Sequence, residues 1–198
     1  MNRRKALKKT ASIAGATALT PTLLSLLQSC QQQPSLNWTP TILSTDQAKL
    51  VSTLVDTILP KTDTPGALEL QVDQFIDLVI TNIFDTKGQQ ALLAQLDSFN
   101  TQCKEEFGDF FANLSSDKRT EVLRREEQEN PKFNKKIWGS AVGEEQKPVG
   151  VYRTLKSMAL WGYFSSEAIG KNVLSYDPIP GAYIGCLPLE EVGNTWSL

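Results

Sequence analysis

Apolar residues recur at helical spacing in five stretches of the chain. The clearest stretch keeps positions i, i+3, i+4 and i+7 apolar over three turns, in Val72, Phe75, Ile76, Val79, Ile80, Ile83 and Phe84. This spacing is typical of an amphipathic helix that buries one face. The other four stretches cover residues 44–59, 92–110, 115–128 and 149–170. No strand-like alternation or internal repeat interrupts them, so the pattern predicts an all-α protein, a bundle of about five helices.

Local signals mark where several of these helices begin and end. Ser44-Thr45-Asp46-Gln47 has the spacing of a capping box, and Pro60 ends the helix that follows. Ser115 or Ser116 can cap the fourth helix. Asn130-Pro131 breaks that helix, and the glycine-containing stretch after it is predicted to be a loop with room for one short helical turn.

The last 27 residues, 172–198, differ in composition from the helical domain predicted over residues 44–171. Prolines and glycines forbid a long helix there, whereas aromatic and aliphatic residues are more frequent than in an ordinary disordered tail. An extended tail of this composition needs a surface to lie on. Two interpretations stay open: the tail packs on its own bundle, or it docks on a partner chain through aromatic anchors.

The first 29 residues, 1–29, have the features of an export signal. Basic residues come first, a modest apolar segment follows, and small residues precede Cys30. The pair Arg3-Arg4 resembles the twin-arginine signal, which implies export in the folded state. Leu27-Gln28-Ser29-Cys30 resembles a bacterial lipobox, which implies cleavage before Cys30 and lipidation of its thiol. The mature protein is then expected on the periplasmic side of a bacterial membrane, anchored by lipid through a polar tether over residues 30–43.

Two alternatives to this interpretation remain. The apolar segment is diluted by polar residues, glycine and proline, so it falls short of the roughly 20 apolar residues that a spanning helix needs. A retained membrane helix is therefore the less favoured alternative. Ala6 stands where the twin-arginine pattern usually has a bulky apolar residue, which leaves the general secretion route open.

Removal of the signal makes the chain acidic. Five of its 20 lysines and arginines lie within residues 1–29, where there is no acid, so 15 bases remain against 22 acids and the net charge is −7. Such a chain has no excess positive charge with which to neutralise phosphates. Nucleic acid is therefore not expected as a partner.

The chain contains no histidine. This excludes Ser-His-Asp and Cys-His catalysis, imidazole metal sites and histidine-ligated haem. The glycine-rich loops that hold dinucleotides or nucleotides are also missing from the sequence. Hydrolysis by paired carboxylates stays formally open, but clusters such as Glu126-Glu127-Gln128-Glu129 are more often a solvated helix face. We therefore predict no catalytic residue, no metal site and no cofactor in this chain.

Cys103 and Cys186 remain as a pair once Cys30 is assigned to lipidation. In an oxidising compartment they could form a disulfide that closes a long loop. In the alternative interpretation, Cys103 is a small buried residue on a helix and Cys186 lies in the docking tail. Two thiols are too few for an iron–sulfur cluster, which needs about four ligands.

Several short motifs, in this order and spacing, resemble the gluconate 2-dehydrogenase subunit 3 family. They are Ile58-Leu59-Pro60, Asp63-Thr64-Pro65-Gly66-Ala67, Gly162-Tyr163-Phe164-Ser165-Ser166-Glu167, Tyr176 with Pro180-Gly181, and Gly185-Cys186. The resemblance extends from about Ser44 to Trp196. It implies a non-catalytic small subunit that carries the export signal. It also implies a partner subunit of the glucose-methanol-choline type that holds FAD, often joined by a cytochrome c subunit.

The resemblance and the export signal together favour an accessory subunit that escorts and docks a flavin-dependent sugar or alcohol dehydrogenase. Arg3 and Arg4 would serve targeting, and Cys30 would serve anchoring. The docking candidates are Tyr163, Phe164, Tyr176, Pro180, Gly181, Tyr183 and Trp196. The aromatic members of this set could equally belong to the core of the bundle. The alternative function is a free-standing envelope lipoprotein with a binding or scaffolding role.

Overall fold

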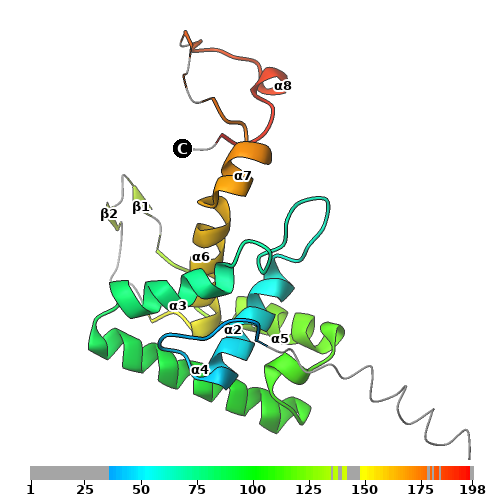
Figure 1. Ribbon diagram of the computed structural model, residues 1–198, viewed down its shortest axis with the longest axis vertical. Coiled ribbons are helices and arrows are strands. Elements are labelled where there is room, and N and C mark those ends of the chain that lie inside the picture. Colours follow the sequence, from blue (N-terminus) through cyan, green and yellow to red (C-terminus); the bar gives the residue numbers. More distant parts are fainter. Residues whose placement is uncertain are drawn as a thin grey trace, which may run out of the picture. The chain divides into compact units, whose positions relative to one another are not determined.

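The computed structural model describes residues 36–134, 136–137, 140–141, 148–177, 179, 181–182 and 184–196. Within these residues the chain forms seven α-helices and one short 3-10 turn (Figure 1). The helices are α2 (Thr45–Ile58), α3 (Val72–Ile83), α4 (Thr86–Phe107), α5 (Ser116–Glu129), α6 (Val151–Phe164), α7 (Glu167–Asn172) and α8 (Leu189–Val192), and the 3-10 turn is η1 (Phe111–Asn113). The predicted all-α bundle is confirmed.

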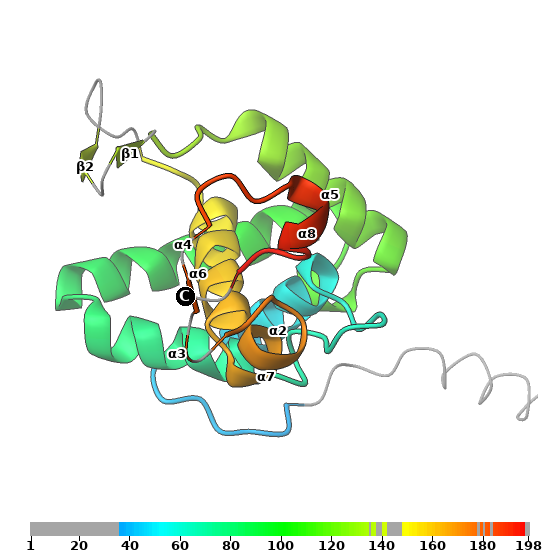
Figure 2. The same ribbon diagram turned by 90° about the horizontal axis from the view of Figure 1, so that it is seen from above.

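Helix α6 is the central element of the bundle. It packs against α2, α3, α4 and α5, and it lies in the middle of the other helices when the molecule is seen from above (Figure 2). Large apolar side chains from all these helices are buried around it: Leu50, Leu54, Ile76, Ile80, Leu96, Val122 and Leu155. The stripes read from the sequence therefore supply most of the core, although Ile83, near the end of the clearest stripe, is 63% exposed.

The starts of the helices follow the capping signals only in part. Ser44 and Gln47 form the predicted capping box: the Ser44 hydroxyl accepts a hydrogen bond from the Gln47 amide at 3.2 Å, and the Gln47 side chain accepts one from the Ser44 amide at 3.0 Å. Ser115 holds the N-cap position of α5. Helix α4 begins six residues earlier than its apolar stripe, because the carboxylate of Asp85 accepts a hydrogen bond from the Gly88 amide at 2.9 Å.

The prediction of one continuous helix over residues 149–170 is wrong, because this stretch forms two helices, α6 and α7. Two serines lie at the break. The Ser165 hydroxyl donates to the carbonyl of Trp161, and the Ser166 hydroxyl donates to the carbonyl of Tyr163, both at 2.7 Å. Such side-chain bonds to the preceding turn compete with helix continuation. Ser166 then becomes the N-cap residue of α7.

Residues 36–43, which we call the N-terminal strap, lie on α3 rather than in a free tether. The buried carboxylate of Asp77 accepts hydrogen bonds from the amides of three strap residues, Thr41, Ile42 and Leu43, at 2.7–3.2 Å. Asp73 accepts a further bond from the indole of Trp38 at 3.0 Å. The folded domain thus begins before the predicted boundary at residue 44. Periodicity does not reveal this, because the strap is held by buried carboxylates of another helix.

A short β-ribbon lies within the stretch predicted as loop between α5 and α6. Strand β1 (Lys136–Ile137) pairs with β2 (Ser140–Ala141) in antiparallel register. Two residues per strand are too few to give an alternating pattern. Among the helices of the described residues, none has both the length and the apolar character needed to cross a membrane.

Gly162 allows α6 to approach α3 closely. A Cβ atom at this position would lie 2.6 Å from Cδ1 of Phe75, closer than real Cβ contacts occur. The Phe75 ring cannot move away freely, because it packs edge-on against the ring of Trp161 with centroids 5.1 Å apart. The contact between α3 and α6 therefore depends on the missing side chain.

We predict that Gly162→Ala lowers the free energy of unfolding by about 1–3 kcal/mol, the range for overpacking a well-packed core. Urea denaturation of the purified protein measures this loss as a lower midpoint. Gly181→Ala is the matched control, because a Cβ there meets nothing within 4 Å. Equal midpoints for the two variants would contradict the close approach of α3 and α6.

Candidate partner-binding face

An apolar groove lies at the C-terminal end of α6 and along α7. Its volume is about 600 Å³, and Thr195 and Trp196 form part of its lining. Four aromatic residues line the groove, and each of them is about half exposed: Trp161 (51%), Phe164 (50%), Tyr176 (47%) and Trp196 (48%). Half-exposed aromatic side chains that converge on one concave surface are typical anchors for a protein partner.

The aromatic residues of α6 are held in place by neighbours from the core. Trp161 packs against Phe75 of α3 at an interplanar angle of 82°. Phe164 packs edge-on against Tyr163, with ring centroids 5.4 Å apart and an angle of 86°. Each ring therefore keeps one side on the fold and offers the other side to the groove. Because these rings are already ordered, little side-chain entropy is lost when a partner binds.

Tyr163 was a docking candidate that could equally belong to the core, and the structure buries it in the core. Its side chain is buried, and its hydroxyl donates to the carbonyl of Pro65 at 3.0 Å and lies 3.3 Å from the hydroxyl of Thr64. The loop between α2 and α3 is thereby tied to α6. The motifs around Pro65 and Tyr163 therefore meet in space, and their contact supports the fold.

The other predicted docking residues have different positions. Phe164, Tyr176 and Trp196 meet in the groove, and Gly181 is exposed in the C-terminal segment. Trp161 was not among the predicted candidates. Its position three residues before Phe164, outside the apolar stripe of the helix, was the signal that could have identified it. Pro180, Tyr183, Arg3, Arg4 and Cys30 lie outside the described residues.

The C-terminal segment turns back so that its two ends meet beside α7. Ser175 and Trp196 form an isolated parallel β-bridge, in which the Ser175 amide donates to the carbonyl of Thr195 at 2.9 Å. The Asn194 side chain donates to the carbonyl of Val173 at 2.7 Å. The segment predicted as an extended tail is thus closed at its base, and we call residues 175–196 the C-terminal loop. This closure brings Trp196 to the groove.

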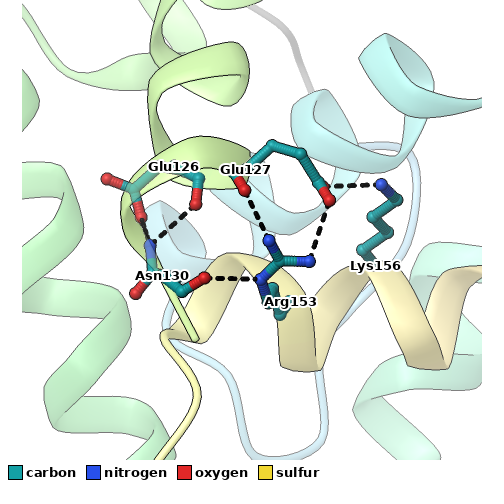
Figure 3. Close-up of polar contacts among 5 residues, drawn as sticks. All are labelled: Glu126, Glu127, Asn130, Arg153 and Lys156. Atoms are coloured by element: carbon teal, nitrogen blue, oxygen red, sulfur yellow. Dashed lines mark hydrogen bonds and ion pairs between the residues drawn. The ribbon is translucent and has the colours of Figure 1, made fainter. Parts of the chain in front are cut away.

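A polar network fixes the N-terminal part of α6 against α5 (Figure 3). Arg153, only 8% exposed, donates from Nη1 to the carboxylate of Glu127 at 2.8 Å and from Nε to the carbonyl of Asn130 at 3.1 Å. Its Nη2 also donates to the carbonyl of Glu127. Lys156 donates to the other carboxylate oxygen of Glu127 at 2.7 Å. An arginine with this many partners holds α6 in one orientation, which in turn places Trp161 and Phe164.

The neighbours of Glu127 shift its ionisation. The hydrogen bond from Lys156 is the main cause that lowers the pKa of Glu127 below its usual 4.5, and Arg153 contributes in the same direction. The same hydrogen bond raises the pKa of Lys156 above 10.5. Both groups are therefore charged at neutral pH, as a structural ion pair requires.

The two described cysteines do not form the disulfide that was considered. Cys103 is a buried free thiol in α4, and Cys186 is an exposed free thiol in the C-terminal loop. Burial raises the pKa of Cys103 to about 11, so this thiol stays protonated and unreactive at neutral pH. The alternative interpretation, in which Cys103 is a small buried residue of a helix, is the one that the structure shows.

Two observations describe the acidic side chains of the part of the chain that the structure covers. No group of three or more Cys, Asp or Glu residues in this part of the chain could hold a metal ion. The buried carboxylates of Asp73 and Asp77 bind the N-terminal strap, as described above.

Within the described residues, the fold and the groove define a mainly helical domain with an aromatic surface suited to contact with another protein. A model of the family described as gluconate 2-dehydrogenase subunit 3 matches residues 45–181. The chain belongs to this family, and it is therefore of the subunit class that accompanies a dehydrogenase. Neither a curated protein nor a solved structure matches the chain.

We predict that Glu127→Gln destabilises the protein at pH 7 and that this effect disappears in acid. The folded-state pKa of Glu127 lies below its unfolded-state value. Its carboxylate therefore contributes stability above the unfolded pKa, and this contribution is lost as the pH falls through the folded pKa. Urea denaturation of both proteins at pH 7 and at lower pH should show a difference in midpoint that shrinks with acidification.

Glu105→Gln is the control, because Glu105 is an exposed glutamate of α4 and the substitution makes the same chemical change. Its midpoint should stay close to that of the wild type throughout. A difference between Glu127→Gln and the wild type that is equally large at both pH values would contradict the role of the Glu127 charge.

Proposed function

We propose that this chain is a non-catalytic accessory subunit that docks on a flavin-dependent dehydrogenase subunit and accompanies it to the periplasmic side of a bacterial membrane. The dehydrogenase subunit would be of the glucose-methanol-choline type and would carry the FAD. Lipid on Cys30 would then hold the complex at the membrane, and a cytochrome c subunit would accept the electrons. The observation that carries the proposal is the convergence of four half-exposed aromatic residues on one groove in a member of a dehydrogenase-subunit family.

The groove has the properties of the centre of a protein interface. Trp161, Phe164 and Trp196 supply large rigid contact surfaces, and interface energy is concentrated in such aromatic anchors. Glu167 and Lys171 form an ion pair at 2.7 Å along one wall, which places polar groups beside the apolar floor. An apolar centre with polar residues around it is the usual anatomy of a protein–protein contact.

The export signal explains why a dehydrogenase would need this companion. A flavoprotein binds its cofactor as it folds, and folding takes place in the cytoplasm. The twin-arginine route carries proteins that are already folded, so one signal can serve a bound pair. Arg3 and Arg4 are the residues that resemble this signal, and a tightly docked partner would travel with them.

We predict that the double variant Phe164→Ala/Trp196→Ala weakens binding of the dehydrogenase subunit at least about 10-fold, because loss of two anchors removes well over 1.4 kcal/mol. The measurement is the dissociation constant of the purified subunits, with the bound flavin as the signal. Leu78→Ala/Ile83→Ala is the matched control, since these exposed apolar side chains lie on α3, away from the groove lining. If both double variants weaken binding equally, or if neither weakens it, the groove is not the docking surface.

We also predict that Arg3→Lys/Arg4→Lys leaves the dehydrogenase activity in the cytoplasm, because the twin-arginine pattern requires arginine itself. Activity measured in separated periplasmic and cytoplasmic fractions tests this. Lys5→Arg, which keeps both arginines, is the control and should export normally. Persistent periplasmic activity in the double variant would show that the escort role is wrong.

A further inference from the structure

The C-terminal loop carries the most exposed aliphatic side chains among the described residues. Ile179 is 83% exposed, Ile184 is 64% exposed and Leu189 is 86% exposed. In Figure 1 this segment extends beyond α7, away from the helices that form the core. We call these three residues the loop crest. They are separate from the groove, since none of them is among its lining residues.

The loop is closed at its base before any partner binds. One closing contact is the backbone hydrogen bond from the Ser175 amide to the carbonyl of Thr195. The Ser175 hydroxyl makes two more: it accepts from the Asn194 amide at 3.2 Å and donates to the Asn194 carbonyl at 3.1 Å. Fixing the two ends of a loop in advance lowers the entropy lost on binding. The crest is therefore presented on a preformed support rather than on a free tail.

The negative charge of the C-terminal segment indicates which kind of partner surface could bind the loop crest. Residues 173–198 contain Asp177, Glu190 and Glu191 but no lysine or arginine. All three carboxylates are on exposed residues. An anionic membrane surface would repel them. An apolar cleft rimmed by lysine or arginine would accept both the crest and its charges.

The family match ends inside the loop. Residues 45–181 match the family model, and this range includes Ile179 but neither Ile184 nor Leu189. The acidic pair Glu190 and Glu191 also lies beyond the matched range. Helices α6 and α7 of the groove and Ile179 thus lie within the matched range, whereas Ile184 and Leu189 lie outside it.

We propose that the C-terminal loop determines which dehydrogenase subunit this chain accepts. Its crest would enter an apolar cleft with a basic rim on the matching dehydrogenase subunit, next to the contact made by the groove. This inference rests on the proposed function, because the partner is the same flavin-bearing subunit. The groove would supply general affinity, and the loop would supply discrimination between related dehydrogenases.

The first experiment removes the crest in the full chain by Ile179→Ser/Ile184→Ser/Leu189→Ser. The probes are the flavin-bearing dehydrogenase subunit expressed together with this chain and a flavin dehydrogenase subunit of the same type from another complex. We expect the crest variant to lose at least about 10-fold in affinity for the first probe and to change little toward the second. The matched control Leu68→Ser/Leu78→Ser/Ile83→Ser removes three exposed aliphatic residues elsewhere and should leave both affinities unchanged.

The second experiment reverses the acidic charges by Glu190→Lys/Glu191→Lys. We expect slower association with the first probe and a weaker dependence of the association rate on salt, as loss of steering predicts. The control Glu105→Lys/Glu129→Lys makes the same charge change in the last turns of α4 and α5, where lysine is favoured by the helix dipole. An identical effect of both pairs would mean that net charge, and not the loop, is responsible, which would overturn the proposal.

Three results separate this inference from the proposed function. Unchanged affinity of the crest variant, together with weak binding of the groove variant Phe164→Ala/Trp196→Ala, overturns the role of the loop and leaves the accessory function intact. Failure of the wild-type chain to bind any dehydrogenase overturns both. Binding of the wild type, but not of the crest variant, to phosphatidylglycerol vesicles or to a second copy of itself, with dehydrogenase affinity unchanged, assigns the loop to membrane or self-association and also overturns the inference.

Discussion

The close contact between α3 and α6 at Gly162 is the constraint on which the rest of the structure depends. Because residue 162 has no side chain, α6 can lie against Phe75 and occupy the centre of the bundle. Arg153 fixes the other end of the same helix through Glu127 and the end of α5. A helix that is held at both ends is fixed in position and in rotation about its axis. The positions of the exposed aromatic residues at its C-terminal end are therefore fixed as well.

The candidate binding face is a consequence of where this central helix stops. Ser165 and Ser166 end α6 by bonding to the preceding turn, and the chain resumes as α7. The break leaves Trp161 and Phe164 beside α7, and closure of the C-terminal loop adds Tyr176 and Trp196 from a distant part of the chain. The groove and the C-terminal loop thus share Tyr176 and Trp196, and in the proposed function both would contact the same dehydrogenase subunit.

Helix content and the core could be predicted well because each depends on local information. The stripe that begins at Val72 forms α3 and buries Val72, Ile76, Val79 and Ile80, and the capping box at Ser44 begins α2 as its spacing indicates. Tyr163 shows the limit of this reasoning. Its aromatic ring and its family motif were compatible with either docking or the core, and the choice was made by a contact of its hydroxyl with Pro65, almost 100 positions earlier in the chain. A residue's neighbours across the fold decide whether it is core or surface.

The amino-acid pattern was sufficient for the fold class, the main helices, the lack of histidine chemistry and the resemblance to a dehydrogenase subunit. Those properties follow from residue identity and from spacings of a few positions. The tertiary structure alone decided that the N-terminal strap lies on Asp73 and Asp77, that Cys103 is buried apart from Cys186, and that four aromatic residues share one groove. The physical reason is that hydrogen bonds and side-chain packing between distant segments depend on where each helix ends and where the chain turns. The spacing of apolar residues within one segment does not specify these contacts.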